Sequence, residues 1–201
     1  MSEKKVFVKG RAPFCHSLDI PQKLIDIIIE EYAEDIESRP LMVGKTIDGR
    51  GEDMRDDGSV NISTRNCELE WIPTTGWLAP LIWYHVKGIN DQYFEYDIKQ
   101  MENIQLTSYS PGEYYHWHTD SHLDKNPIDR KLTCVVQLSD ESDYEGGELQ
   151  ILHPGYSGME VGPKKKGTLI VFDSRLAHRV RPIKSGKRIA AVCWALGPKW
   201  R

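Results

Sequence analysis

The densest group of metal-binding side chains in the sequence runs from Tyr114 to His122 and contains three histidines and one aspartate. Within it, His118 and Asp120 are separated by one residue. On a β-strand this spacing places both side chains on the same face, where an imidazole nitrogen and a carboxylate oxygen can reach one ion. We therefore expect His118 and Asp120 to be two ligands of a metal whose third ligand comes from elsewhere in the chain.

The most suitable third ligand is His178, which lies in a short β-like segment nearer the C-terminus. Two histidines and one carboxylate on one face of an octahedral ion are typical of non-haem Fe(II) oxygenases, in which the other positions bind substrate and O₂. Arg188 follows ten residues later, which is far enough for a hairpin to bring it back beside His178. Because a guanidinium can hold a carboxylate with two hydrogen bonds, the pattern favours a dicarboxylate cosubstrate that chelates the metal and pairs with Arg188.

A second His-x-Asp triplet, His122 to Asp124, competes with the first. It continues into Lys-Asn-Pro, a composition typical of a loop, and a loop would not hold two ligands on a rigid face. We therefore assign the metal to His118 and Asp120 and expect Asp124 to be dispensable. His116 and His122 share strand parity with His118 if the strand persists, and we interpret both as solvated or outlying histidines.

Seven short segments after about residue 103 are rich in β-branched and aromatic residues, and Gly-, Pro- and Ser-containing turns separate them. They are Ile104–Tyr109, Glu113–Thr119, Lys131–Ser139, Glu148–Leu152, Gly167–Phe172, His178–Pro182 and Lys187–Leu196. Short strands at regular spacing predict an all-β sandwich, barrel or jelly roll. The absence of helical patterns between them argues against a parallel α/β sheet.

The first hundred residues are expected to form a helical support for this β core. Residues 24–32 carry apolar side chains at helical spacing, and Asp19 is the expected cap of that helix. A second helix is predicted from about Thr75 to Lys87 and is expected to end at Gly88. Residues 44–61 are rich in Gly and Asp, and we interpret them as a mobile surface loop that can also close over a substrate.

Length and composition restrict the class of protein. A chain of 201 residues favours one domain, and 39% apolar with 28% charged residues is typical of a globular protein rather than a disordered one. No apolar run is long enough for a membrane span, and a net charge of -4 gives no bulk attraction to nucleic acid. The N-terminus lacks a signal-peptide pattern, and the four cysteines are far apart, which predicts a cytoplasmic protein with reduced thiols.

The order of a His-x-Asp triplet, a later histidine and an arginine ten residues beyond it resembles the Fe(II)/2-oxoglutarate-dependent dioxygenase superfamily. The flanking residues resemble its prolyl 4-hydroxylase branch. They lie in Gln105–Gly112, Tyr144–Leu149, His178–Val180 and Arg188–Trp194. The resemblance is close over about residues 100–197 and extends weakly back to Trp77. It implies an α+β fold in which a double-stranded β-helix (jelly-roll) core spans 101–197 and N-terminal helices pack against it, within a single domain of residues 1–201.

The resemblance also implies roles for individual residues. His118, Asp120 and His178 would bind Fe(II), and Arg188 would pair with the distal carboxylate of 2-oxoglutarate. Three further positions match residues that contact the cosubstrate or line the pocket in relatives; these are Tyr109, Gln137 and Trp194. Gln137 stands where some relatives carry a second cosubstrate-binding tyrosine, so the pattern differs at that point.

The activity implied by the resemblance couples oxidative decarboxylation of 2-oxoglutarate, to succinate and CO₂, with hydroxylation of a C–H bond by O₂. Fe(II) is the implied metal and ascorbate an additional cofactor. The expected substrate is a prolyl residue in a peptide or protein, and a free amino acid or another small molecule is the alternative.

Other classes remain open from the residues alone. A non-catalytic jelly-roll module that binds a metal such as zinc, or a cupin-type metalloenzyme, has no need of Arg188. A nucleobase or tRNA substrate is disfavoured by the acidic charge balance, and we interpret Lys164-Lys165-Lys166 as a solvated turn. No spacing supports a paired-carboxylate hydrolase or a cysteine nucleophile. The oligomeric state is not indicated.

Overall fold

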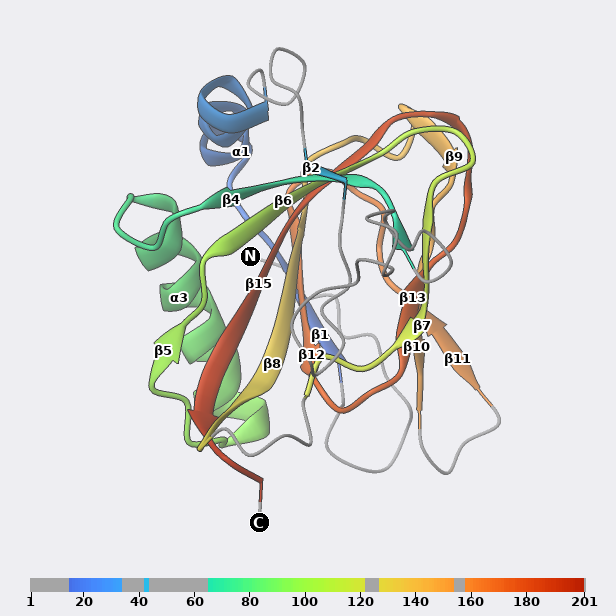
Figure 1. The fold of residues 1–201 in the computed structure, drawn as a ribbon. Coiled ribbons are helices and arrows are strands. Elements are labelled where there is room, and N and C mark those ends of the chain that lie inside the picture. The colour runs from blue at the N-terminus through green and yellow to red at the C-terminus, as the bar shows by residue number, and fades with distance from the viewer. Residues whose placement is uncertain (1–14, 34–41, 44–64, 122–126, 154–157, 201) are drawn as a thin grey trace.

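Two β-sheets face each other in the computed structural model, and helices cover the outer face of the larger sheet (Figure 1). The loop expected at residues 44–61 and the second His-x-Asp triplet both lie outside the residues that the structure describes. The described residues are 15–33, 42–43, 65–121, 127–153 and 158–200.

Strands outnumber helices in the described part of the chain. The helical elements are α1 (Gln22–Ile28), which continues as the π-helical turn η1 (Ile29–Ala33), and α3 (Leu78–Ile89), which continues as η2 (Asn90–Phe94). The strands are β1 (Cys15–Asp19), β2 (Met42–Val43), β3 (Arg65–Asn66), β4 (Glu68–Ile72), β5 (Gln100–Met101), β6 (Ile104–Tyr109), β7 (Tyr114–His118), β8 (Ile128–Gln137), β9 (Tyr144–Gly146), β10 (Leu149–Leu152), β11 (Met159–Val161), β12 (Thr168–Asp173), β13 (His178–Val180), β14 (Ile183–Gly186) and β15 (Arg188–Pro198).

The larger sheet has the strand order β1-β12-β8-β15-β6-β4-β2, with β5 added beside β15. The smaller sheet has the order β11-β10-β13-β7-β3, and β14 pairs with β9 separately. Every one of these pairings is antiparallel. Two facing antiparallel sheets with helices on one outer face confirm the predicted α+β jelly-roll class.

Both faces of the larger sheet are covered, and strand β8 shows how. Leu132, Cys134 and Val136 belong to the apolar core that the sheet forms with the helices, whereas Thr133 and Val135 line the pocket between the sheets. This division follows from the alternation of side chains along a strand. Residues at every second position of β6, β8 and β15 are therefore directed into the space where the site lies.

All seven predicted strands are present, with their ends within three residues of the expected positions. The first hundred residues, however, supply strands as well as helices. Strand β1 pairs with β12, β4 pairs with β6, and β3 pairs with β7. These pairings join segments that are far apart in the sequence, so local patterns do not reveal them.

Two expected helix boundaries are wrong. Asp19 does not cap α1, because its carboxylate pairs with the ammonium of Lys165 across 2.5 Å. Gly88 lies inside α3 rather than at its end, and the helical path continues to Phe94, where Glu95 adopts a left-handed conformation with φ 55°. At Asp19 a contact with a residue distant in the sequence outweighs the local signal.

Cys67, Cys134 and Cys193 are free and buried. Cys134 and Cys193 lie opposite each other on β8 and β15 and belong to the apolar core, which agrees with their interpretation as small apolar side chains. Among the described helices, none is both long enough and apolar enough to span a bilayer.

Candidate active site

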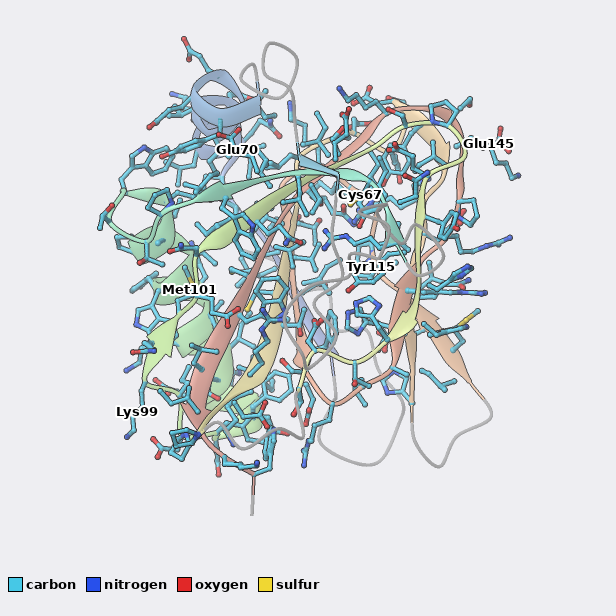
Figure 2. The ribbon with its side chains drawn as sticks, in the orientation of Figure 1. Cys67, Glu70, Lys99, Met101, Tyr115 and Glu145 are labelled. Atoms are coloured by element: carbon cyan, nitrogen blue, oxygen red, sulfur yellow. The ribbon has the colours of Figure 1, made fainter. Side chains whose placement is uncertain are left out.

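A β-bulge in β7 directs His118 into the space between the sheets. His178 lies opposite His118 on the neighbouring strand β13, whereas Val180 lies opposite Tyr115, so β7 carries one extra residue in this interval. The bulge breaks the alternation of the strand. As a result Tyr115 and His118 both line the pocket, as Figure 2 shows for Tyr115, while His116 is exposed.

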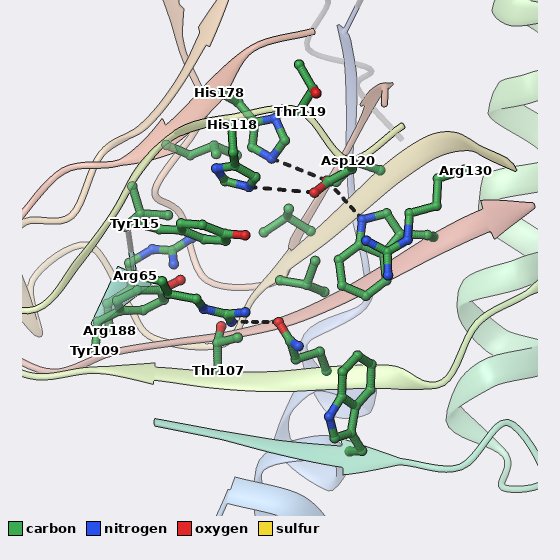
Figure 3. A pocket seen from close by; sticks show the side chains of 18 residues that line it. Arg65, Thr107, Tyr109, Tyr115, His118, Thr119, Asp120, Arg130, His178 and Arg188 are labelled. Atoms are coloured by element: carbon green, nitrogen blue, oxygen red, sulfur yellow. Dashed lines mark hydrogen bonds and ion pairs between the residues drawn. The ribbon is translucent and has the colours of Figure 1, made fainter. Parts of the chain in front are cut away.

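The three expected metal ligands lie together (Figure 3). Nitrogen atoms of His118 and His178 and a carboxylate oxygen of Asp120 all lie within 4.8 Å of one another. The Nε2 atom of His118 is 3.6 Å from Oδ1 of Asp120, and the Nε2 atom of His178 is 3.3 Å from Oδ2. Asp120 is held in place through its backbone N–H, which donates to the carbonyl oxygen of Ser174.

Each histidine is oriented by a backbone carbonyl two residues earlier. The Nδ1 atom of His118 is 2.8 Å from the oxygen of His116, and Nδ1 of His178 is 2.9 Å from that of Leu176. Because a carbonyl oxygen can only accept, Nδ1 carries a proton in both rings, so in the neutral form of either ring the lone pair is on Nε2. Both Nε2 atoms face Asp120, which is the arrangement that a shared metal requires.

The carboxylate of Asp120 has one occupied and one available oxygen. Oδ2 accepts hydrogen bonds from the Thr133 hydroxyl, at 2.7 Å, and from the Trp194 indole N–H, at 2.9 Å. Oδ1 accepts no hydrogen bond from the described residues. Thr133 and Trp194 therefore fix the carboxylate while leaving one oxygen for a cation.

The protonation states of His118, Asp120 and His178 depend on one another. Burial, followed by the nearby His178, lowers the pKa of His118 to about 3. Burial alone would raise the pKa of Asp120, but His178 and His118 hold it well below its usual range. Burial opposes protonation of His178, yet Asp120 raises the pKa of His178 above its ordinary value. Without a metal, a proton on His178 therefore balances the buried carboxylate.

Arg188 lies in the same pocket and is 1% exposed. Its Nη2 donates to Oε1 of Gln137 at 3.0 Å, and its guanidinium lies 5.6 Å from the ring centre of Tyr109. Its Nε has no hydrogen-bond partner among the described residues, and neither has the buried Tyr144 hydroxyl. A buried guanidinium with an unsatisfied donor is suited to bind a carboxylate that enters the pocket.

The remaining expected site residues occupy different places. Tyr109 and Trp194 line the pocket. Gln137 does not line it but lies behind Arg188, and its amide nitrogen donates to the carbonyl oxygen of Pro163. Gln137 thus positions the guanidinium, whereas contacts of any of these residues with a cosubstrate stay a prediction.

Several pocket residues were not expected from the sequence. Arg130 stacks on Trp194 at 3.7 Å and is paired with Glu102 at 2.6 Å. Arg65 reaches into the pocket from β3 and donates to Oε1 of Gln105. The alternating pattern from Arg65 to Ile72 could have indicated a strand, but it could not have shown which strand lies beside it.

A family model described as the 2OG-Fe(II) oxygenase superfamily matches residues 104–196. This range contains the three clustered ligands and Arg188. Over residues 104–196 the chain is similar to this superfamily. The clustered His118, Asp120 and His178 and the buried Arg188 therefore lie in the part of the chain that carries the family pattern.

Curated relatives are similar to about half of the chain. A PKHD-type hydroxylase from Idiomarina loihiensis is 34% identical over 96 residues, which cover 48% of this chain and 43% of the relative. One from Synechococcus sp. (strain CC9902) is 36% identical over 99 residues, covering 48% and 42%. The matched region thus spans less than half the length of these relatives.

Solved structures share the fold over most of the chain. A prolyl-4-hydroxylase from Pseudomonas putida superposes with a TM-score of 0.68 at 17% identity, covering 90% of this chain and 91% of that one. A Trichoplax adhaerens prolyl hydroxylase in complex with a hypoxia-inducible-factor peptide fragment gives 0.71 at 17% identity, covering 90% and 83%. The viral collagen prolyl hydroxylase from Paramecium bursaria Chlorella virus-1, in its 2OG complex, gives 0.64 at 22%, covering 92% and 96%.

Proposed function

We propose that this protein is an Fe(II)- and 2-oxoglutarate-dependent oxygenase that hydroxylates a C–H bond of a prolyl substrate. The observation that carries the proposal is the presence, in one pocket, of a two-histidine, one-carboxylate cluster and a buried arginine with an unsatisfied donor. A metal site that serves structure alone has no use for such an arginine.

The donor set fits Fe(II). His118, Asp120 and His178 would hold the ion through two Nε2 atoms and one carboxylate oxygen, the ligand set found in non-haem iron oxygenases. Bound iron would supply the activation of O₂ that oxidises the substrate. The protein contributes fixed ligand directions, through the carbonyl contacts of both histidines and the two donors to Asp120.

The cosubstrate would be anchored by Arg188. A guanidinium at 1% exposure is held by Gln137, so it is already oriented before a ligand arrives. One carboxylate of 2-oxoglutarate would satisfy the free Nε donor, and the Tyr144 hydroxyl is a second available donor. Tyr109 would line the path between this anchor and the metal.

The prolyl character of the substrate is supported by the neighbouring folds, whose names refer to prolyl hydroxylases, and the relatives are named as hydroxylases. We extend the proposal to a prolyl residue of a peptide or protein, with a free amino acid as the alternative. We also propose that residues 1–201 act as one domain with residues 101–197 as its catalytic core, that ascorbate supports turnover, and that the enzyme is cytoplasmic.

A nucleic-acid substrate receives no support from the basic run. Lys164 donates to the carbonyl oxygen of Gly146, Lys165 pairs with Asp19, and Lys166 lies 3.6 Å from Asp26. These lysines are engaged by the protein's own acceptors, so the run is not an open basic surface.

The proposal is tested by turnover of purified protein with Fe(II), 2-oxoglutarate, ascorbate and O₂. We expect succinate to form, its rate to rise when a proline-containing substrate is added, and one oxygen atom to be found in that substrate by mass spectrometry. The matched control is His178→Ala, which should form no succinate. Succinate formation at equal rates in the wild type and in this variant would contradict the proposal.

A further inference from the structure

Arg65 is a second buried arginine in the pocket, and the proposed mechanism does not use it. It is 4% exposed and lies on β3, where it is paired opposite Tyr115 of β7. Its guanidinium lies 4.7 Å from the ring centre of Tyr115, whose ring is stacked at 3.5 Å on His118. In Figure 3 Tyr115 lies between Arg65 and His118, and Arg65 lines the same pocket as the His118, Asp120 and His178 cluster.

The neighbours of Arg65 orient it but do not neutralise it. Nη2 donates to Oε1 of Gln105 at 2.6 Å, and Nε to Sγ of Cys67 at 3.0 Å. Within the described residues, no carboxylate lies at ion-pair distance from it. Burial raises the pKa of the Cys67 thiol and raises that of Tyr115 to about 12, so neither group supplies a negative charge near neutral pH.

The charges that Fe(II) and 2-oxoglutarate would bring to the site do not neutralise Arg65. The two positive charges of Fe(II) and that of Arg188 are balanced by Asp120 and the two carboxylates of 2-oxoglutarate. Arg130 has its own counter-ion in Glu102. Among the arginines that the structure describes in this pocket, Arg65 is the one left without a counter-ion, and a buried charge without a partner is costly.

We propose that Arg65, oriented by Gln105, binds a free carboxylate of the prime substrate, so that the preferred substrate is a proline with a free α-carboxylate. This proline is either the free amino acid or the C-terminal residue of a peptide, and not an internal prolyl residue. The inference rests on the proposed function and selects among its substrates. It assigns Arg65 as a specificity-determining residue.

The test compares N-acetyl-L-proline with N-acetyl-L-prolinamide, which differ only in the carboxylate. Binding is measured on protein loaded with Mn(II) and 2-oxoglutarate, which does not turn over, by the fluorescence of the pocket residues Trp71 and Trp194. We expect wild-type protein to bind the acid at least about tenfold more tightly than the amide, because the acid gains a charge-assisted bidentate contact. In Arg65→Gln this ratio should fall to about one, with the affinity for 2-oxoglutarate changed by less than about threefold.

Two further variants keep the result interpretable. Arg130→Gln removes an arginine of the same pocket that already has a counter-ion, and it should leave the acid-to-amide ratio unchanged. Arg65→Lys keeps the charge and should keep a preference for the acid, even if Arg65→Gln fails to fold. Thermal unfolding of each variant separates a local effect from loss of the fold.

Three results would overturn the inference. These are equal binding of both probes by wild-type protein, binding of neither, or an Arg65→Gln variant whose 2-oxoglutarate affinity falls as far as that of Arg188→Gln. The last result would mean that Arg65 binds the carboxylate of 2-oxoglutarate that chelates the metal. Failure of the proposed function would be recognised separately, because the metal-loaded wild type would then not bind 2-oxoglutarate at all.

Discussion

Trp194 donates its indole N–H to Oδ2 of Asp120 across 2.9 Å. The donor comes from β15 and the acceptor from the residue pair that follows β7, so one hydrogen bond joins the larger sheet to the proposed metal ligand that follows the smaller sheet's β7. Thr133 of β8 donates to the same oxygen. The carboxylate is therefore positioned by the larger sheet, while both histidines come from the smaller one.

This relationship makes Trp194 a positioning residue for the metal. Trp194→Phe keeps an aromatic ring beneath Arg130 but removes the N–H, and we expect metal affinity to fall roughly 10- to 100-fold, as for other outer partners of metal ligands. Trp77→Phe is the matched control, because Trp77 donates to Glu31 at the exposed surface. Metal affinity is measured by titration for the wild type and for both variants. If Trp194→Phe binds the metal as tightly as Trp77→Phe, the hydrogen bond does not orient Asp120.

Arg188 is expected to govern the affinity for 2-oxoglutarate and not the affinity for metal. Arg188→Gln removes a buried charge-assisted contact, so the dissociation constant of 2-oxoglutarate should rise at least about tenfold while that of the metal is unchanged. Arg179→Gln is the control, since Arg179 bonds to Gln150 outside the pocket. Equal losses of both affinities in Arg188→Gln would indicate misfolding instead.

The raised pKa of His178 predicts that metal binding releases a proton. His118, with a pKa of about 3, and Asp120, with a strongly lowered pKa, do not titrate near neutral pH. His178 must lose its proton to bind a metal, so below its raised pKa the metal affinity should fall by up to about tenfold per pH unit. Calorimetry in buffers of different ionisation enthalpy measures the proton count, and no release at any pH would contradict this charge assignment.

The choice between the two His-x-Asp triplets can be tested directly. Asp120→Ala should abolish metal binding, whereas Asp124→Ala should leave metal binding and turnover nearly unchanged. Asp124 lies outside the described residues, so its dispensability is a prediction from the sequence. Loss of metal binding in Asp124→Ala together with its retention in Asp120→Ala would transfer the site to the second triplet.

Local patterns in the sequence were sufficient for the β core and for the grouping of the ligands. The alternation of apolar and polar residues in Ile104–Tyr109 is a local property of the sequence and is sufficient to predict a strand there, although the whole strand is buried. His118 and Asp120 do lie together, although β7 ends at His118 and Asp120 follows the strand. Arg188 shares their pocket, but the expected hairpin beside His178 is wrong, because Arg188 lies on β15 of the larger sheet and His178 on β13 of the smaller one.

Features that depend on distant pairing could not be predicted. Asp19 carries a capping signature, but the pairing of β1 with β12 places it beside Lys165. The bulge that directs both Tyr115 and His118 inward exists only in the register with β13. Arg65 enters the pocket because β3 lies beside β7, and no local signal near residue 65 points to that contact.

The most direct test of the account is an anaerobic spectrum of metal-free protein to which Fe(II) and then 2-oxoglutarate are added. Chelation of Fe(II) by the keto acid in the proposed site should produce a weak visible charge-transfer band that neither component shows alone. The band should be absent in His178→Ala and should require more 2-oxoglutarate in Arg188→Gln. Iron binding without the band in wild-type protein would contradict the oxygenase assignment and favour a metal-binding module.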